Sequence, residues 1–169
     1  MSKNKLENRN LLSPTGFNFI LTHSKSVDFY CNAANLPSIN MGTAVQSSYL
    51  KDIDVPGDKI VYDDLVLQFL VDEDMVNYLE IYNWLMALGY PQSIGQTFDK
   101  YNRTYSDATM EILSSNYQPN LKINFKDIFP VSLSTIQFDA KNSDIEYVTA
   151  EATFKYKHYS IVDTKGNEY

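Results

Sequence analysis

The chain has 169 residues, of which 44% are hydrophobic, and a formal net charge of −7. This length and composition suit one folded domain with its own core and exclude a chain that is disordered throughout. The acidic balance, without a cluster of Lys and Arg, argues against ordinary binding to a nucleic-acid backbone. Aromatic residues reach 14%, with 13 Tyr and 9 Phe, and this bias favours strands and large interfaces.

A single cysteine, Cys31, excludes an intramolecular disulfide framework and fits a reducing compartment. Residues 1–10 are polar and charged, so we expect no secretion signal there. No apolar run approaches the roughly 20 residues that a membrane helix needs. We therefore expect a protein that assembles in the cytoplasm and has no membrane partner.

The first part of the chain is predicted to hold a flexible arm and a hairpin. Residues 1–13 are largely polar and form the N-terminal arm. Residues 17–22 and 27–33 have the composition of strands, and a polar turn at residues 23–26 joins them. Pro37 ends the second strand, since proline cannot donate to a β-ladder.

Residues 38–58 form the least regular stretch that still looks ordered. Gly42 and Pro56 interrupt it, and a strand pair with an open, extended loop fits this pattern. The stretch is long for a hairpin in a compact monomer, so we expect it to contact another subunit. Residues 65–71 follow as a strand that is apolar on both faces, which predicts a central position in its sheet.

One helix is predicted, over residues 73–88. The acidic residues 72–74 favour a helix start, and Gly89 with Pro91 beyond it are stop signals. The helix carries more apolar residues than one buried face requires. They are Tyr78, Ile81, Tyr82, Trp84, Leu85 and Leu88. The excess suggests a second contact, with another subunit.

The rest of the chain reads as a polar loop, four strands and a tail. These elements are the loop at 95–107, a hairpin of 110–114 with 121–125, strands at 133–139 and 148–159, and the polar tail at 163–169. Seven or eight strands with one helix predict a mainly β fold in a single domain over 14–162. We expect an antiparallel β-barrel or a sandwich of two packed sheets, with one flanking α-helix.

Candidate catalytic groups are few. His23 lies in a predicted turn and His158 near the end of the last strand, so each is expected to be a surface or packed residue rather than a general base. Cys31 lies among apolar residues and is expected to be a small buried hydrophobe. No phosphate-binding loop, serine elbow or zinc spacing occurs. We therefore predict no catalytic residue, no metal site and no cofactor, and a protein that is not an enzyme.

One segment resembles a calcium-binding loop. Counted from Asp52, acidic residues and Gly57 fall at several of the positions that such a loop requires, ending at Asp63. However, Pro56 takes the place of a ligand, Asp63 is shorter than the usual Glu, and strands rather than helices are predicted on both sides. A Pro-Gly turn between two strands is the preferred interpretation. Residues 72–74 are likewise interpreted as helix capping rather than as a metal cluster.

Several short motifs follow one another in a characteristic order. They are residues 17–20 (FNFI), 29–37 (FYCNAANLP), 55–58 (VPGD), 62–65 (YDDL), the helix bearing Trp84, 128–130 (IFP) and 133–139 (LSTIQFD). Their order and spacing over about residues 14–160 resemble the tail tube proteins of contractile-tailed phages. The resemblance does not place residues 89–107 or the N-terminal arm.

The resemblance implies a barrel of two antiparallel sheets with one flanking helix, in a structural protein of the virion tail. Such subunits would form hexameric rings that stack into a tube inside the contractile sheath. The implied partners are further copies of this chain, the tail sheath protein and the tube-initiator proteins of the baseplate, while DNA passes the lumen without specific binding. The lack of a large appended domain favours the repeating tube subunit. The alternatives are a tube-initiator or tube-terminator ring at an end of the tail, or a small ligand-binding β-barrel.

The predicted subunit contacts lie on the stretch of residues 38–58, here called the excursion, and on the helix. Extended backbone in the excursion can add to a neighbouring sheet or dock on the next ring. The residues proposed for these contacts are Val45, Tyr49, Leu50, Ile53, Val55, Tyr78, Ile81 and Trp84.

Overall fold

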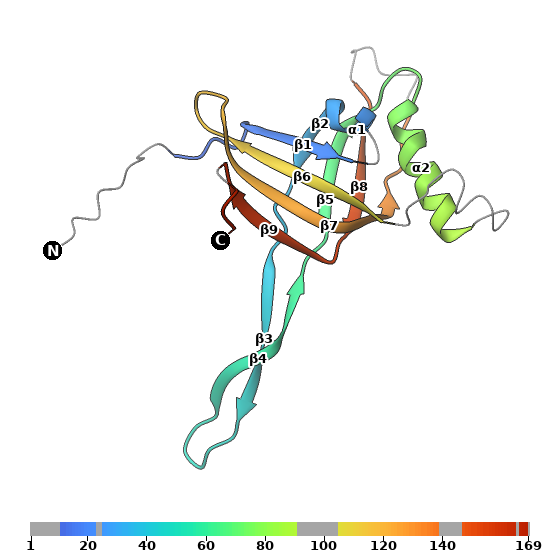
Figure 1. Ribbon diagram of the computed structural model, residues 1–169. Helices are drawn as coiled ribbons and strands as arrows, with labels where there is room; N and C mark the ends of the chain where they lie inside the picture. Colours follow the sequence, from blue (N-terminus) through green and yellow to red (C-terminus); the bar gives the residue numbers. More distant parts are fainter. Residues whose placement is uncertain (1–10, 23–24, 91–104, 139–146, 165, 169) are drawn as a thin grey trace.

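The fold is mainly β, as predicted (Figure 1). The computed structural model describes residues 11–22, 25–90, 105–138, 147–164 and 166–168. Its strands are β1 (Phe17–Leu21), β2 (Cys31–Ala34), β3 (Ile39–Gln46), β4 (Ile53–Tyr62), β5 (Leu65–Leu70), β6 (Ser106–Leu113), β7 (Pro119–Leu133), β8 (Thr149–Lys155) and β9 (His158–Asp163). Its helices are α1 (Lys25–Tyr30) and α2 (Val76–Gly89).

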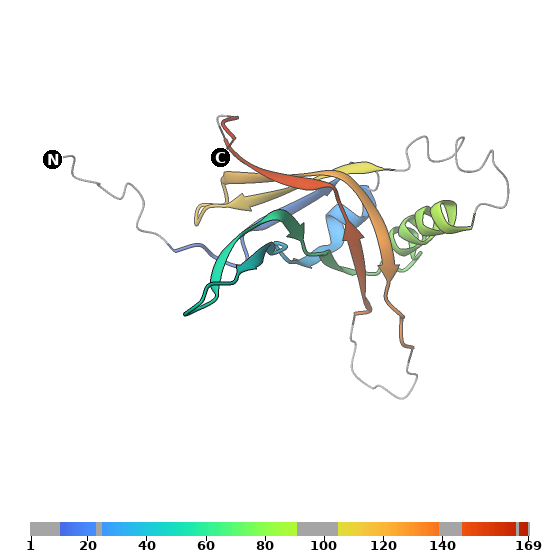
Figure 2. The ribbon, with the colours of Figure 1, turned by 90° about the horizontal axis from the view of Figure 1, so that it is seen from below.

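Two antiparallel sheets share the long strand β7. The first sheet contains β1, β6, the first part of β7 and β9, and the second contains the last part of β7, then β8, β5 and β2. A bulge at Asp127, which has a φ of 54°, interrupts the pairing of β7 with β6. The long, curved β7 passes from one sheet into the other (Figure 2). The barrel remains open on one side, because β1 and β2 approach each other without being hydrogen-bonded neighbours.

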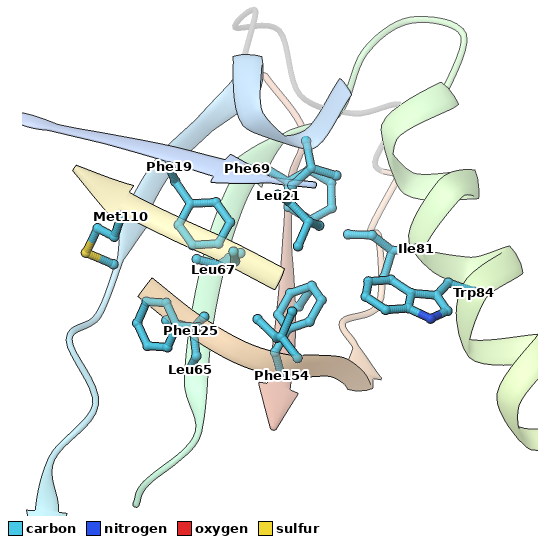
Figure 3. Packing of buried hydrophobic residues seen from close by; sticks show 14 of the residues in the cluster. Phe19, Leu21, Leu65, Leu67, Phe69, Ile81, Trp84, Met110, Phe125 and Phe154 are labelled. Carbon is cyan, nitrogen blue, oxygen red and sulfur yellow. The ribbon is translucent and has the colours of Figure 1, made fainter. Parts of the chain in front are cut away.

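The core lies between the two sheets and is closed at one side by helix α2 (Figure 3). Its largest fully buried side chains are Trp84, Phe19, Phe69, Phe125, Phe154, Leu21, Leu65, Leu67, Ile81, Ile123, Ile128 and Val27. The indole of Trp84 lies against the ring of Phe154, with 6.2 Å between ring centroids. Large hydrophobic side chains therefore fill the space between the sheets.

Strand β5 has the central position that its sequence predicts. It pairs with β8 on one side and β2 on the other. Leu65, Leu67 and Phe69 are fully buried, while the residues between them are half-buried, which is the two-residue period of a strand. The opposing residues of β8 alternate in the same way, so that Phe154 meets Leu65 across the ladder.

The predicted hairpin of residues 17–22 with 27–33 is wrong. Strand β1 pairs with β6 in the first sheet, β2 pairs with β5 in the second, and helix α1 connects them. The helix buries Val27 completely, and the carboxylate of Asp28 accepts a hydrogen bond from the backbone N–H of Leu21. These tertiary contacts override the strand propensity of the segment.

The C-terminal strands also differ from the prediction. Leu133 ends β7, and residues 134–138 are not a strand. The single strand expected at 148–159 is divided into β8 and β9, because the chain turns at residues 156 and 157 from the second sheet into the first. The hairpin of β6 and β7 is confirmed, although β6 already begins at Ser106, inside the predicted loop.

Helix α2 begins later than expected. Its first residue is Val76, and Met75, with a φ of 53°, precedes it, so the acidic residues 72–74 lie before the first turn. Asp72 still acts near the helix start, because its carboxylate accepts the N–H of Asn77 at 3.4 Å. Asn77 is fully buried and donates its side-chain N–H to the carbonyl of Leu70 at 2.7 Å, which ties the helix to β5. Side chains therefore cap the helix, but by a different arrangement from the predicted one.

Candidate subunit interface

Strands β3 and β4 form a two-stranded ribbon, the arm (residues 39–62), which projects from the rest of the molecule, the body (Figure 1). None of the residues in these two strands is buried. The strand pair predicted around residues 38–58 is therefore present, and its returning strand continues to Tyr62. The segment from Asp52 to Asp63, which resembles a calcium loop in sequence, lies largely in this returning strand rather than between helices.

The arm continues a strand pair of the body. The backbone N–H of Asn35 donates to the carbonyl of Val66 at 3.2 Å, and the N–H of Asp63 donates to the carbonyl of Ser38 at 3.1 Å. The side chain of Asn35 also accepts the N–H of Val66 at 2.6 Å and donates to the carbonyl of Asp64 at 3.2 Å. These bonds connect the β2–β5 pair to the β3–β4 pair, so the arm is an extension of the second sheet.

A bulge halfway along the arm requires glycine. The register between the strands shifts between Met41 and Thr43, opposite residues 57–59. A Cβ on Gly57 would lie 2.3 Å from the carbonyl oxygen of Gly42, too close for any side chain. A Cβ on Gly42 would meet nothing within 4 Å. The close approach of the two strands therefore depends on Gly57 and not on Gly42.

The residues predicted for subunit contacts on the arm are mostly exposed. The exposed fractions are 62% for Val45, 101% for Tyr49, 90% for Leu50 and 51% for Ile53, while Val55 is half-buried. Further apolar side chains of the arm are exposed that the sequence prediction did not name: Ile39, Met41, Ile60 and Val61. Alternating apolar residues on an isolated ribbon were the signal that could have identified them.

The residues predicted for contacts on helix α2 lie mainly in the core. Ile81 and Trp84 are 0% and 1% exposed, so their side chains pack within the body. Tyr78 is half-buried, and its hydroxyl donates to the carbonyl of Ser134 at 3.4 Å. Ile81 and Trp84 therefore present almost no surface to a neighbouring subunit in this conformation.

The outer side of α2 carries a different apolar stripe. Val76, Leu79, Tyr82 and Met86 are 44%, 46%, 45% and 37% exposed. Their spacing of three and four residues places them along one face of the helix. The excess of apolar residues in the helix is therefore real, but the exposed ones are mostly not those that the sequence analysis selected.

The lysines of β7 and β8, and the lysine that follows β8, lie beside carboxylates. Lys122 lies 2.7 Å from Glu111 and Lys126 lies 2.9 Å from Asp107. Lys155 and Lys157 lie 3.3 Å and 3.9 Å from Asp64 and Asp127. These pairs compensate the positive charge of the lysines on the described parts of these strands.

Among the described residues, the candidate reactive groups lie apart from one another. Cys31 is half-buried, and desolvation raises the pKa of its thiol to about 11, so the nucleophilic thiolate is scarce. His158 is exposed at the start of β9, and His23 lies outside the described residues. In the described part of the chain, no group of three His, Cys, Asp or Glu side chains could hold a metal ion. Neither described helix has the length and apolar character to cross a membrane.

A surface pocket of about 580 Å³ lies at the end of the second sheet, where β5 meets the segment before α2. Its lining is mainly apolar, from residues such as Leu70, Val71 and Phe138, with Asp72 and Glu73 as acidic members. It lies outside the space between the sheets, which core side chains occupy.

The architecture of the described residues is thus an open β-barrel whose interior is filled by side chains, with a flanking helix and a projecting arm. Such an architecture defines a class of protein that presents exposed apolar surfaces for contacts with other proteins.

This chain belongs to the phage tail tube protein family, whose sequence model matches residues 7–162. It is therefore a structural component of a virion tail, as the motif resemblance implies. The chain is 23% identical to the tail tube terminator protein of Enterobacteria phage T4 over 159 residues, which cover 90% of this chain and 89% of that protein.

Solved structures share the fold. A chain of the anti-feeding prophage cap, a tube terminating cap, matches with a TM-score of 0.67 at 16% identity. The matched region covers 95% of this chain and 97% of the cap chain. A chain of the sheath–tube complex of PVC, an extracellular contractile injection system, has a TM-score of 0.66 at 15% identity and covers 92% and 94%. At these identities the likeness establishes the barrel fold of contractile injection systems.

Proposed function

We propose that this protein forms the ring that terminates the tail tube of a contractile phage tail. The observation that carries the proposal is the similarity to the tail tube terminator of phage T4, which extends over about nine-tenths of both chains. The fold, which a chain of a tube terminating cap shares, is compatible with this role. The proposal replaces the repeating tube subunit, which the lack of a large appended domain favoured in the sequence analysis, with one of the alternatives considered beside it.

The arm would supply the main contact between subunits. A two-stranded ribbon in water is marginally stable, and this one exposes Val45, Tyr49, Leu50 and Ile53. Both outer edges of the arm also carry backbone groups that no third strand pairs with in the described residues. A neighbouring copy that covered the ribbon would bury these side chains and could pair with an edge.

The outer stripe of α2 would supply a second contact. It lies on the body rather than on the arm, so it can face a different neighbour (Figure 1). Candidate neighbours are another copy in the ring, the last ring of the tube, and the sheath protein. Assembly would take place in the host cytoplasm, with hexameric symmetry and with DNA passing through the ring.

The repeating tube subunit is the second candidate. A chain of the PVC sheath–tube complex matches this fold with a TM-score of 0.66, almost equal to the 0.67 of the terminating cap. Overall fold therefore does not favour one role over the other, and the preference for the terminator depends on the relative from phage T4.

Copy number in the virion separates the two candidates. We expect quantitative mass spectrometry of purified particles to find this chain at the amount of one ring per tail, with the tube subunit many-fold more abundant. Cryo-electron microscopy of the same particles should place the chain at one end of the tube. An abundance of many rings, or density along the whole tube, would establish the repeating subunit instead. Absence from the particle would contradict both candidates.

A further inference from the structure

Four aromatic rings gather where the arm leaves the body. The root cluster consists of Tyr62 from the end of the arm, Phe125 from β7, Tyr156 between β8 and β9, and Tyr159 from β9. Tyr62 lies edge-on to Tyr156 and Tyr159, with centroid distances of 5.9 Å and 5.5 Å. Phe125 lies 5.1 Å and 5.7 Å from the same two rings. Such edge contacts are favourable, and they join the arm to the first sheet.

Two hydroxyl groups of this cluster reach the two strands that enter the arm. Tyr159 donates to the carbonyl of Pro37, in the segment that leads into β3, at 3.3 Å. Tyr156 donates to the carbonyl of Asp63, directly after β4, at 2.9 Å. Each strand of the arm is therefore held at its base by one tyrosine hydroxyl from a part of the chain roughly a hundred residues away in sequence.

These bonds lie where the regular strand pairing of the ribbon is interrupted. Regular pairing stops between β2 and β3 at residues 35–38, and between β4 and β5 at residues 63 and 64. A few hydrogen bonds of Asn35 and Asp63 are what join the arm to the second sheet across this interruption, so an arm held by them alone could change direction relative to the body. The tyrosines come from β9 and from the turn before it, so they add a connection to the first sheet, separate from the strands that the arm continues.

The hydroxyls are suited to act as donors. Burial raises the pKa of Tyr156, with further contributions from Tyr159 and Tyr62, and burial also raises the pKa of Tyr159. Both groups therefore stay protonated well above neutral pH and keep the O–H that the two carbonyls accept.

We propose that Tyr156 and Tyr159 are positioning residues that hold the arm at a fixed direction in the free subunit, before any partner covers it. An arm ordered in advance loses less conformational freedom when the ring forms, so association is stronger than for a freely pivoting arm. The expected effect on association rests on the proposed function, in which the arm contacts a partner. The fixed direction of the arm in the free subunit is independent of the proposed function.

Distance measurements between spin labels test the proposal directly. Labels would be attached at Ser48→Cys near the arm tip and Thr149→Cys on β8, in a Cys31→Ser background and at concentrations where the protein is monomeric. We expect one narrow distance distribution for this protein and at least a twofold broader one for the Tyr156→Phe/Tyr159→Phe double variant. Tyr117→Phe, in the exposed β6–β7 turn, is the matched control and should keep the narrow distribution.

Replacement by Phe removes the two hydroxyl groups but keeps the aromatic rings. The direction of the arm should therefore change without unfolding of the body. Thermal unfolding should confirm that the body of the double variant stays folded at the measurement temperature, and each single variant can replace it if it does not. Sedimentation would then measure association, and we expect the double variant to need about tenfold more protein for half-assembly. The proposal would be overturned by a broad distance distribution in the protein that keeps both tyrosines. It would also be overturned by a narrow distribution in the Tyr156→Phe/Tyr159→Phe variant. Neither result depends on where in the virion the protein lies, so they remain distinct from a failure of the terminator assignment.

Discussion

The body and the arm are built from similar kinds of residue but bury them very differently. In the body, Phe19, Leu67, Phe125 and Phe154 are at most 1% exposed. In the arm, Val45, an equally apolar residue, is 62% exposed. Both regions are antiparallel ribbons of alternating side chains, so local sequence preference does not distinguish them. The difference lies in whether a second layer of the same chain covers the ribbon.

This comparison separates residues that fold the subunit from residues that assemble it. The core of the body contains no side chain of the arm. Substitutions in the body should therefore change stability, and substitutions toward the tip of the arm should change association while leaving the body folded. Four predictions test this division between folding and assembly residues, ordered from the largest expected effect on the subunit to the smallest.

The largest effect is expected for Trp84→Ala. The indole is 1% exposed and packs on Phe154, so its removal leaves a cavity that costs about 3–5 kcal/mol of unfolding free energy. Chemical denaturation of the purified subunit measures this loss. Tyr82→Ala is the matched control, since it removes an aromatic ring from the same helix at a site that is 45% exposed. Equal destabilisation by the two changes would show that α2 does not pack as described.

A smaller, local effect is expected for Gly57→Ala. The new Cβ would meet the carbonyl oxygen of Gly42 at 2.3 Å, so the strands must separate, at a cost of about 1–3 kcal/mol that falls on the arm. Hydrogen exchange should become faster in residues 39–62 and stay unchanged in β5 and β8. Gly42→Ala is the control, because its Cβ meets nothing within 4 Å. Faster exchange throughout the body would mean that the arm and body unfold together.

At the tip, Tyr49→Ser combined with Leu50→Ser should leave the unfolding free energy within about 0.5 kcal/mol of the original. Both side chains are almost fully exposed, so the subunit loses no packing. Association should nevertheless weaken, because these residues would be covered by a partner. Sedimentation compares the variant with Tyr117→Ser, a change at an exposed site in the β6–β7 turn of the body. Unchanged association at the tip would remove Tyr49 and Leu50 from the interface.

The sequence predicts the covered parts of the fold better than its connections. The apolar run at residues 65–71 and the short segment at 121–125 were correctly predicted as strands, since strands that pack on the core carry a local composition that marks them. Helix α1 was missed because six residues carry too little periodicity to outweigh the strand preference of Val27 and its neighbours. The bend between β8 and β9 was missed for a related reason: residues 156 and 157 include no Gly or Pro that would mark a turn, and only the sheets that the two strands join distinguish them.

The candidate interface shows the same limit. The sequence predicts apolar side chains in excess of what one core needs on residues 38–58 and on the helix, and the structure exposes apolar side chains in both places. It does not predict that Leu79 and Met86 of the helix are exposed while Ile81 and Trp84 are buried, because a helix that is apolar on several faces does not reveal which face packs on its own sheets. The aromatic contacts at the arm root join residues far apart in sequence, and no local pattern predicts them.

The smallest effect concerns Cys31, which can report on the body without disturbing it. Its side chain is half-buried at the start of β2 and packs against the core, and burial raises the pKa of the thiol to about 11 from an ordinary 9.0. Because only the thiolate reacts, raising the pKa lowers the reactive fraction, and we expect alkylation at pH 8 to be about 100-fold slower than in the unfolded chain. The rate should rise as pH increases toward 11 while the protein remains folded.

The alkylation rate of Cys31 then distinguishes substitutions in the body from substitutions in the arm. Trp84→Ala should speed labelling of Cys31, because the destabilised body opens more often, whereas the Tyr49 and Leu50 changes should leave the rate as it was. Mass spectrometry of the quenched reaction follows both. If the arm-tip variant also labelled faster, the arm would stabilise the body that it extends, and folding and assembly would share residues after all.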